Sequence, residues 1–300
     1  MNRNFIYFIN PISGTKNKEA LLQLIAQKTR KQNIPYQVLH TNASGDYTYL
    51  KEKINKEKIT DIIICGGDGT VNQVAGSLLD VDINIGIIPM GSGNGLALTA
   101  GIPKNTSKAL DIIFQGKASY IDGFDINSSF SCMLCGLGFD ALIAHEFAQH
   151  PSRGLFTYVK LSFKKFFTAR FYPFTIEANN TIINADAFFI SIANSNQFGN
   201  NFTIAPKASL SDGLLDIVIV NKMSKLRLVY TILKQIRAGK VEQTTGKKFH
   251  QKDIQYFQTK KLEIKNPVPA PLHIDGEPAE TVTELAITIK KKCFRLLQPV

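Results

Sequence analysis

Three glycines, an acid and a hydroxyl residue follow a short β-branched run early in the chain. The run is Ile62-Ile63-Ile64-Cys65, and Gly66-Gly67-Asp68-Gly69-Thr70 comes directly after it. A pattern with helical spacing begins at Val71, so the stretch predicts a strand, a tight turn and a helix N-terminus. Backbone N–H groups at such a turn can bind an anion, and glycine lets the main chain approach a phosphate closely.

Asp68 is the unusual member of this turn, because a carboxylate repels a phosphate bound beside it. A bound Mg²⁺ would remove that conflict, and the acid could otherwise take part in proton transfer. The residues alone also fit an ordinary strand-to-helix turn in which Asp68 is a capping residue.

Two more polar loops that contain glycine follow predicted strands. The strand at Phe5–Ile9 ends at Asn10-Pro11-Ile12-Ser13-Gly14, and the strand at Ile85–Ile88 is followed by Gly91-Ser92-Gly93-Asn94. Strands and helices alternate over the first 120 residues, which predicts a parallel sheet with helices on both faces. The carboxyl ends of such strands lie at one edge, so the three loops can converge on one ligand.

The pattern changes after about Phe124. Short strand-like runs joined by turns dominate from there, including one over 129–137, and helices are expected only over 140–149, 155–169 and 225–239. This half predicts a β-rich domain with an antiparallel sheet.

Composition limits the classes of protein that fit. The chain has 300 residues, 44% of them apolar, and a net charge of +11, which suits an anionic membrane, a nucleotide phosphate or nucleic acid. No nucleic-acid-binding motif occurs, so no nucleic-acid partner is expected. The uncharged stretch from Ile83 to Pro103 contains five glycines and two prolines, which argues against a lipid-exposed helix. Cys132 and Cys135 have the spacing of a metal or redox pair, but without a second pair they are expected to be buried thiols in a reducing cytoplasm.

No Walker-type loop and no protein-kinase catalytic run occur. The three loops instead resemble those of the diacylglycerol kinase catalytic family, which includes bacterial soluble lipid kinases, sphingosine kinases and ceramide kinases. Three motifs extend the resemblance over nearly the whole chain: Ala205-Pro206-Lys207-Ala208, Asp212-Gly213-Leu214-Leu215-Asp216 and Asp275-Gly276-Glu277.

The resemblance implies an α/β plus β architecture. An N-terminal parallel-sheet domain similar to NAD kinase and phosphofructokinase would cover 1–124, completed by the C-terminal segment 286–300. An antiparallel β-sandwich for the lipid substrate would cover 125–285, with an active-site cleft between the domains.

The resemblance also implies ATP and Mg²⁺ as cofactors and a set of site residues. Glu277 would be the general base and Asp68 a second catalytic residue, and a structural Mg²⁺ would be bound by Ser209, Asp212 and Leu214. The nucleotide would be bound by residues of the glycine loops and their neighbours: Asn10, Pro11, Ser13, Gly14, Thr41, Gly66, Gly67, Asp68, Gly69, Thr70, Val71, Asn72, Gln73, Gly91, Ser92, Gly93 and Asn94.

The residues around Glu277 are compatible with that role. Glu277 follows a glycine after the apolar run Leu272–Ile274, so it is expected at a strand end, where a carboxylate can project. Taken alone, the same position also suits a solvated turn acid. His273 is a second candidate base, although a histidine inside a short strand is more often structural.

The chemistry favoured is transfer of the γ-phosphate of ATP to a lipid hydroxyl, with diacylglycerol converted to phosphatidate. A sphingoid-base or ceramide kinase is the alternative, because Gly91-Ser92-Gly93-Asn94-Gly95-Leu96-Ala97 looks more like the sphingosine-kinase form of that loop. An NAD kinase and a non-catalytic lipid-binding protein are further alternatives.

The segment 158–171 interleaves aromatic residues with basic ones. We expect a helix there to contact an anionic membrane through Lys160, Lys164 and Lys165, although the pattern also fits a helix packed on the sandwich with its lysines in solvent. A cytoplasmic protein, peripheral at the inner face of the membrane, is therefore expected, with a membrane lipid as substrate. Whether the chain forms a homodimer is left open.

Overall fold

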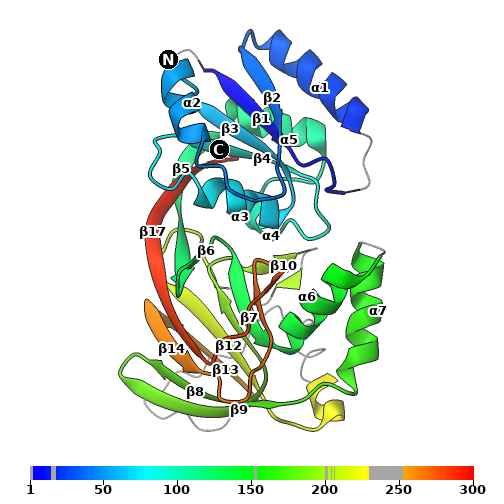
Figure 1. The fold of residues 1–300 in the computed structure, drawn as a ribbon, viewed down its shortest axis with the longest axis vertical. Coiled ribbons are helices and arrows are strands. Elements are labelled where there is room, and N and C mark those ends of the chain that lie inside the picture. Colours follow the sequence, from blue (N-terminus) through cyan, green and yellow to red (C-terminus); the bar gives the residue numbers. More distant parts are fainter. Residues whose placement is uncertain are drawn as a thin grey trace. The chain divides into compact units, whose positions relative to one another are not determined.

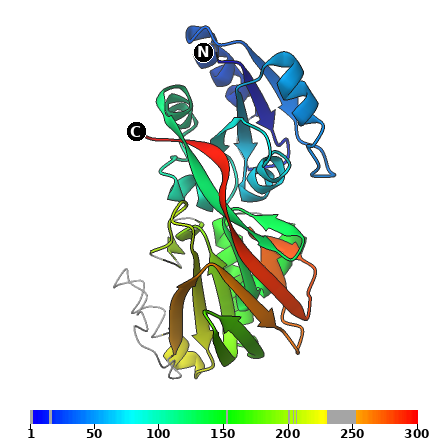
Figure 2. The same ribbon diagram turned by 90° about the vertical axis from the view of Figure 1, so that its left-hand side faces the viewer.

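A computed structural model describes residues 3–14, 18–151, 154–199, 202–203, 205, 207–229 and 253–300. The chain divides into two compact units (Figures 1 and 2). Unit 1 comprises Met1–Asp122 and Lys291–Val300, and unit 2 comprises Gly123–Lys290. The last segment joins unit 1 at Lys291, and the residues before it, such as Leu285 and Ile287, pair with a strand of unit 2.

Unit 1 is built on a parallel sheet with the strand order β4-β3-β1-β2, and the C-terminal end of β17 lies beside β4. The strands and helices of this unit are β1 (Phe5–Ile9), α1 (Lys18–Lys31), β2 (Tyr36–His40), α2 (Leu50–Glu57), β3 (Asp61–Gly66), α3 (Asp68–Gly76), β4 (Asn84–Pro89), α4 (Gly95–Thr99) and α5 (Thr106–Gln115).

The central strands β1 and β3 are buried along their whole length, as expected for a parallel sheet covered on both faces. Leu21 and Ile25 of α1 and Leu110 of α5 pack against one face of this sheet. On the other face, Phe8 packs edge-on against Tyr47, which precedes α2. The alternation of strands and helices that the sequence predicts is therefore confirmed.

Unit 2 is an antiparallel sandwich, and two strands belong partly to each unit. β5 (Lys117–Ile126) begins in unit 1 and ends in unit 2, and β17 (Glu284–Gln298) begins in unit 2 and ends in unit 1. Its other strands and helices are β6 (Ser129–Ser131), β7 (Leu134–Gly138), α6 (Phe139–Gln149), α7 (Leu155–Phe166), β8 (Tyr172–Ala178), β9 (Thr181–Ala193), β10 (Gln197–Gly199), β11 (Phe202–Thr203), β12 (Leu215–Asn221), β13 (Ile254–Thr259), β14 (Lys261–Lys265), β15 (Leu272–Ile274) and β16 (Glu277–Ala279).

The long strand β9 joins the two layers of the sandwich. Its first half pairs with β8, and its second half pairs with β7 and β12. One apolar core fills the interior, with Ile190 and Ile217 on one side and Ile176 and Ile264 on the other. Helix α6 packs on β7, β15 and β16.

Several predicted bounds in unit 2 are wrong. The single strand expected over 129–137 is two strands, β6 and β7, because the chain turns at Cys132 and Met133, whose N–H groups point at the carboxylate of Asp275. Helix α7 ends at Phe166 rather than Ala169. The helix expected over 225–239 lies mostly outside the described residues. Among the described helices, none is long and apolar enough to cross a membrane.

Candidate active site

The glycine loops of unit 1 follow β1, β3 and β4, which are neighbours in the parallel sheet. Asn10 Nδ2 donates a 2.8 Å hydrogen bond to Thr70 Oγ1, which joins the loop after β1 to the loop after β3. Gly14, at φ +66°, lies against the loop after β4, and a Cβ there would come within 2.2 Å of the Met90 carbonyl oxygen. The structure therefore brings the three loops together at one edge of the sheet.

The loops after β3 and β4 meet through two glycines. A Cβ on Gly91 would lie 2.7 Å from the Gly67 Cα, and a Cβ on Gly67 would lie 3.1 Å from the Gly91 Cα. Gly67 is also the N-cap residue of α3, and because it has no side chain it makes no capping hydrogen bond. Close backbone approach beside a helix N-terminus that begins at a glycine is an arrangement that binds a phosphate, so this edge fits a nucleotide phosphate.

Asp68 is the first residue of α3, and its carboxylate connects two loops. Oδ2 accepts a hydrogen bond from the Gly95 N–H at 3.0 Å, and Oδ1 accepts one from the Leu96 N–H at 3.3 Å. Asp68 therefore caps the short helix α4 from a neighbouring loop. A carboxylate at this position is also a ligand type that Mg²⁺ takes in proteins.

Asn94 closes the loop after β4 on itself. Its Oδ1 accepts the Gly91 N–H at 2.8 Å, and its Nδ2 donates to the Gly91 carbonyl at 2.6 Å. The residue is buried and left-handed at φ +57°, a conformation that asparagine tolerates better than most residues. The Asn94 side chain thus holds the loop in shape.

The remaining predicted nucleotide residues of unit 1 lie around these loops. Thr41 follows the end of β2, and its N–H donates a hydrogen bond to the carbonyl of Ile9 in β1. Gln73 lies beside Gly45, because a Cβ added to Gly45 would be 3.0 Å from the side-chain amide of Gln73. Val71 is buried in the core, so only its main chain is available to a ligand. Pro11 and Ser92 are exposed, and Ser13, Gly69, Asn72 and Gly93 are half-buried.

Glu277 begins β16 on the second side of a tight hairpin in unit 2. Ile274 and Glu277 pair across the turn, and the two residues between them, Asp275 and Gly276, have φ values of +49° and +82°. Two consecutive positive φ values define the two-residue turn that best joins twisted antiparallel strands. The Glu277 side chain is exposed, as expected for a carboxylate at the start of a strand.

Asp275 anchors this hairpin from below. Its carboxylate is buried and accepts hydrogen bonds from Ser131 Oγ at 2.6 Å and from the N–H groups of Cys132, Met133 and Leu134 at 3.0–3.2 Å. Burial raises the pKa of Asp275, and these hydrogen bonds offset part of the increase. The Asp275 N–H also donates to the Leu134 carbonyl at 2.8 Å, so the hairpin is tied to the start of β7.

His273 is a fully buried support of the same hairpin. Its Nδ1 accepts the Gly276 N–H at 3.3 Å, so Nε2 carries the ring proton and donates to Asp140 Oδ2, also at 3.3 Å. A Cβ on Gly136 would come within 2.6 Å of the imidazole, so glycine is required beside it. The structure places His273 as a structural residue.

The predicted metal residues lie on one turn-rich loop before β12. Ser209 Oγ accepts the Ser211 N–H at 3.4 Å, and Asp212 Oδ1 accepts the Leu214 N–H at 3.0 Å. No group of three or more histidine, cysteine, aspartate or glutamate side chains in the described part of the chain has metal-site geometry. A hydroxyl, a carboxylate and a carbonyl are nevertheless the hard oxygen ligands that Mg²⁺ takes.

Asp216, near the start of β12 and two residues after Leu214, adds an acid beside this loop. It is buried, with Tyr256 and Gln258 as donors to Oδ1, while Oδ2 has no hydrogen-bond partner. Burial, with a smaller contribution from the nearby Asp212, raises the pKa of Asp216 to about 6, although the hydrogen bonds from Tyr256 and Gln258 act in the opposite direction. Two acids side by side with an unsatisfied buried oxygen fit a neighbouring cation, so the residues of this loop fit the implied Mg²⁺.

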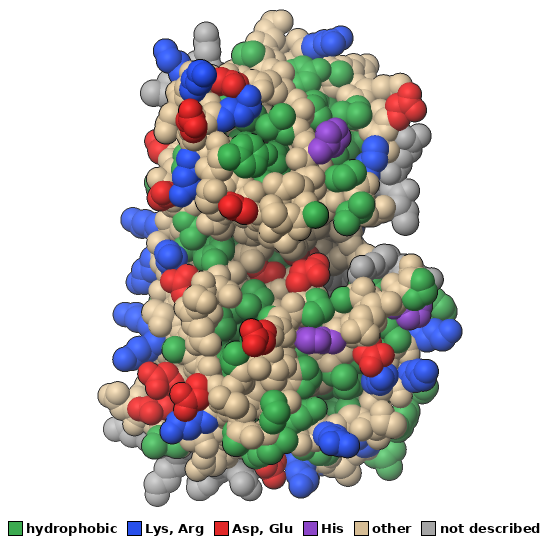
Figure 3. Space-filling view, viewed as in Figure 1, with side chains coloured by type: hydrophobic (Ala, Val, Ile, Leu, Met, Phe, Trp, Pro, Cys, Tyr) green, Lys and Arg blue, Asp and Glu red, His purple; other side chains and the backbone are tan. Residues whose placement is uncertain are grey.

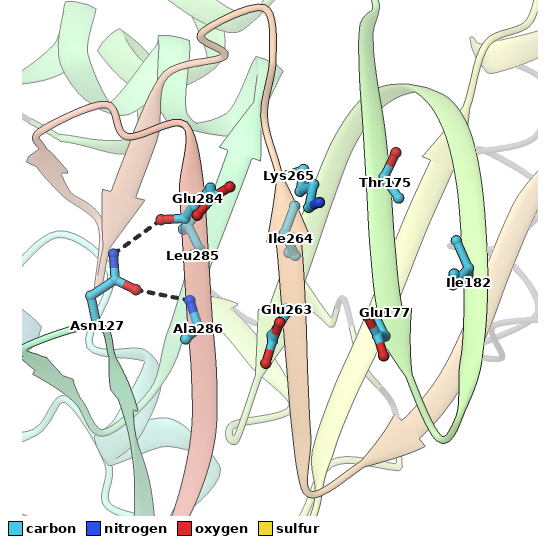
Figure 4. A pocket seen from close by; sticks show the side chains of 10 residues that line it. All are labelled: Asn127, Thr175, Glu177, Ile182, Glu263, Ile264, Lys265, Glu284, Leu285 and Ala286. Carbon is cyan, nitrogen blue, oxygen red and sulfur yellow. Dashed lines mark hydrogen bonds between the residues drawn. The ribbon is translucent and has the colours of Figure 1, made fainter.

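A surface hollow of about 380 Å³ lies elsewhere in unit 2, on the outer side of β8, β14 and β17 (Figure 4). Its lining includes Glu177, Glu263, Glu284 and Lys265, and Asn127 bonds the backbone of β17 there. None of the predicted site residues lines this hollow.

Two protein-family models match the chain, one over most of unit 1 and the other over most of unit 2. The diacylglycerol kinase catalytic domain matches residues 4–126, and the YegS C-terminal NAD kinase beta sandwich-like domain matches residues 134–298. The chain belongs to the diacylglycerol kinase-like lipid kinase family.

Members of this family from several bacteria align with almost the full chain. A probable lipid kinase YegS-like from Shewanella frigidimarina is 28% identical over 96% of this chain and 92% of its own length. A diacylglycerol kinase from Bacillus subtilis is 24% identical over 89% of this chain and 88% of its own. The crystal structure of a putative diacylglycerol kinase from Bacillus anthracis has a TM-score of 0.78 at 20% identity, over 99% of this chain and 97% of that one, so the two share a fold.

Sequence reasoning for this lipid kinase missed the residues that support the site. The sequence indicates Asp275 only as part of a motif, and it predicts no supporting role for Ser131, Asp140 or Asn94. Two signals were present: an acid before Gly276 suits a turn with positive φ, and an asparagine in a glycine loop suits the left-handed conformation.

Proposed function

We propose that this lipid kinase transfers the γ-phosphate of ATP to the hydroxyl of diacylglycerol and produces phosphatidate. The observation that carries the proposal is the meeting of three strand-end loops in unit 1, where Gly67 and Gly91 approach too closely for any side chain. Relatives named diacylglycerol kinase, such as that of Bacillus subtilis, support the choice of acceptor.

In the proposed reaction, main-chain N–H groups at the N-terminus of α3 bind the phosphates and hold the γ-phosphate in place. Glu277 accepts the proton of the lipid hydroxyl while the oxygen of that hydroxyl forms a bond to the γ-phosphorus. The bond from that phosphorus to the β–γ bridging oxygen breaks, and ADP leaves with the electron pair. Phosphoryl transfer needs positioning and charge neutralisation more than covalent participation of the protein.

Mg²⁺ would supply charge neutralisation when bound. Asp68, an acid in the first turn of α3, would help to hold a catalytic ion beside the phosphates, and Ser209, Asp212 and Leu214 would hold a structural ion in unit 2. Asp68 also keeps the loops after β3 and β4 in register through its bonds to α4.

The test is incubation of the purified full chain with γ-labelled ATP and mixed micelles that contain diacylglycerol, ceramide or a sphingoid base, with NAD⁺ as a soluble acceptor. Labelled phosphatidate is the expected product. Label in a phosphorylated sphingoid base or ceramide would show that the protein is a lipid kinase with a different acceptor lipid, and label only in NADP⁺ would show that the acceptor is not a lipid. No transfer to any acceptor would favour the alternative of a lipid-binding protein without catalytic activity.

A further inference from the structure

Helix α7 has one face that packs against unit 2. The Tyr158 ring lies edge-on to Phe147 of α6 at a centroid distance of 5.7 Å, and Phe166 packs edge-on against Phe139 and Phe188. Lys165 forms a 2.6 Å ion pair with Glu146 of α6. These contacts fix the helix on unit 2 and decide which of its residues face outward.

The segment that follows α7 is also held in place. Lys225 Nζ donates to the Ala169 carbonyl at 3.1 Å and lies 4.4–5.2 Å from the ring centroids of Phe166, Phe171 and Phe188. The orientation of the helix is therefore set by contacts along its length rather than by its first turn alone.

The opposite side of α7 exposes large apolar side chains. Phe156 is 84% exposed, Val159 55%, Phe163 71% and Phe167, directly after the helix, 61%. Steps of three and four residues place them in one row, called here the α7 stripe. Scattered single apolar residues are normal on a surface, whereas a row that includes three phenylalanines indicates an interaction site.

Basic residues flank the α7 stripe. Lys160 and Lys164 are exposed beside it, and Arg170 is exposed just beyond the helix. The ion pairs recorded for the described residues use neither of the two lysines, and residues 155–170 contain no acid. Figure 3 shows hydrophobic and basic side chains together over the region of α7.

We propose that the α7 stripe inserts into the interface of an anionic lipid bilayer, with Lys160, Lys164 and Arg170 at the headgroups. This inference rests on the proposed lipid acceptor, which must be reached at a bilayer. Aromatic residues on one side of a helix with lysines beside them suit the headgroup boundary, and the basic charge selects an anionic leaflet over a neutral one. Lys165, which the sequence also predicts as a membrane contact, is left out of this proposal because it forms an ion pair with Glu146 of α6.

The experiment is flotation of the full chain with vesicles of phosphatidylcholine alone or with 30% phosphatidylglycerol, a composition chosen to be about as anionic as a strongly charged leaflet. The test variant is Phe156→Ser/Phe163→Ser, and the matched control is Ile182→Ser/Val268→Ser, which removes exposed apolar side chains elsewhere in unit 2. A charge variant, Lys160→Glu/Lys164→Glu, is compared with Lys261→Glu/Lys265→Glu on β14.

Wild type and both controls are expected to float with the anionic vesicles. Both α7 variants are expected to lose binding by about tenfold or more, because insertion and charge attraction act together. Their turnover of short-chain diacylglycerol in detergent micelles should stay within about twofold of wild type, which shows that they fold.

Three outcomes would overturn the proposal. One is unchanged flotation of the α7 variants, and another is an equal loss in the controls. The third is a change from dimer to monomer in sedimentation with flotation unaltered, which would make the α7 stripe an interface between two copies of the chain. Flotation that depends on the stripe without transfer to any lipid would instead reject only the proposed function.

Discussion

The turn after β3 in unit 1 and the turn after β15 in unit 2 each place an acid directly after a glycine. In Gly67-Asp68 the carboxylate accepts two backbone N–H groups of α4, so the acid supports its own loops. In Gly276-Glu277 the carboxylate is exposed, and the supporting bonds are made by Asp275, two residues earlier. An acid next to a glycine in a motif can thus serve as an anchor, as a reactive group, or as both.

The difference follows from what each turn must hold. The loops of unit 1 are short and rich in glycine, with few side chains available to fix them, so Asp68 and Asn94 bond to main-chain atoms. The hairpin of unit 2 stands on a sheet, and buried donors beneath it satisfy Asp275. Glu277 is exposed and available for the proposed proton transfer, and this division of roles leads to five predictions.

Replacing the exposed acid should have the largest effect. Glu277→Gln is expected to lower kcat by about 10²–10⁴-fold, the usual contribution of a general base, with little change in thermal stability because the side chain is exposed. Steady-state transfer to diacylglycerol micelles measures it, with Glu280→Gln as a control at an exposed acid three residues away. Near wild-type kcat in Glu277→Gln would remove the base from the proposed reaction.

Replacing the anchor acid of unit 2 should lower stability. Asp275→Asn puts an NH₂ group among donors that need an acceptor, so the free energy of unfolding should fall by about 2–3 kcal/mol. Urea denaturation measures the change, and Asp125→Asn on the surface of β5 is the control. A loss no greater than that of the control would show that the hydrogen bonds to Asp275 do not support the hairpin.

The same variant tests the pH dependence. Because the pKa of Asp275 is raised in the folded state, its contribution to stability is fully present below the ordinary pKa of an aspartate, about 4, and declines as the pH rises through the raised value. The stability difference between wild type and Asp275→Asn should therefore be larger at pH 5 than at pH 8. A difference that grows with pH would mean that the hydrogen bonds outweigh burial.

Replacing the anchor acid of unit 1 should cost less, because Asp68 acts as a cap. Asp68→Ala is expected to lower the free energy of unfolding by about 1 kcal/mol, and Asp68→Asn, which keeps an acceptor oxygen, should recover at least half of that loss. Chemical denaturation of both variants measures the effect. Equal losses in the two would indicate that the negative charge matters more than the hydrogen bonds to α4.

The smallest effect is expected where two loops of unit 1 are joined by neutral groups. Asn10→Ala removes the bond to Thr70 Oγ1, and the free energy of unfolding should fall by about 0.5 kcal/mol, the lower end of the range for a neutral hydrogen bond. A double-mutant cycle with Thr70→Val isolates the pair, and a coupling near zero would show that the two loops meet through their glycines alone.

Much of unit 1 could be predicted from the sequence, because the information is local. The apolar runs of β1 and β3 and the glycine loops after them depend on neighbours in the chain, and the carboxyl-edge rule brings the loops together. Unit 2 could be predicted only in outline. The break between β6 and β7 depends on Asp275, more than 140 residues away, and no local pattern reports such a contact.

The same difference between local and long-range information applies to the site residues. Gly67, Gly91 and Glu277 lie in recognisable motifs, whereas Ser131 and Asp140 become part of the site only through tertiary contacts. On α7, the aromatic and basic interleaving was visible, but the sequence did not separate the outward Lys160 and Lys164 from Lys165, which pairs across to α6.

The last strand has a consequence for synthesis of the chain. β4 receives its parallel neighbour from Arg295 and Leu296, more than 200 residues downstream. Residues up to Leu296 must therefore emerge from the ribosome before unit 1 can close its sheet, although β1 to β4 are made much earlier. Removing the final ten residues would leave β4 with an open edge, a surface prone to aggregation.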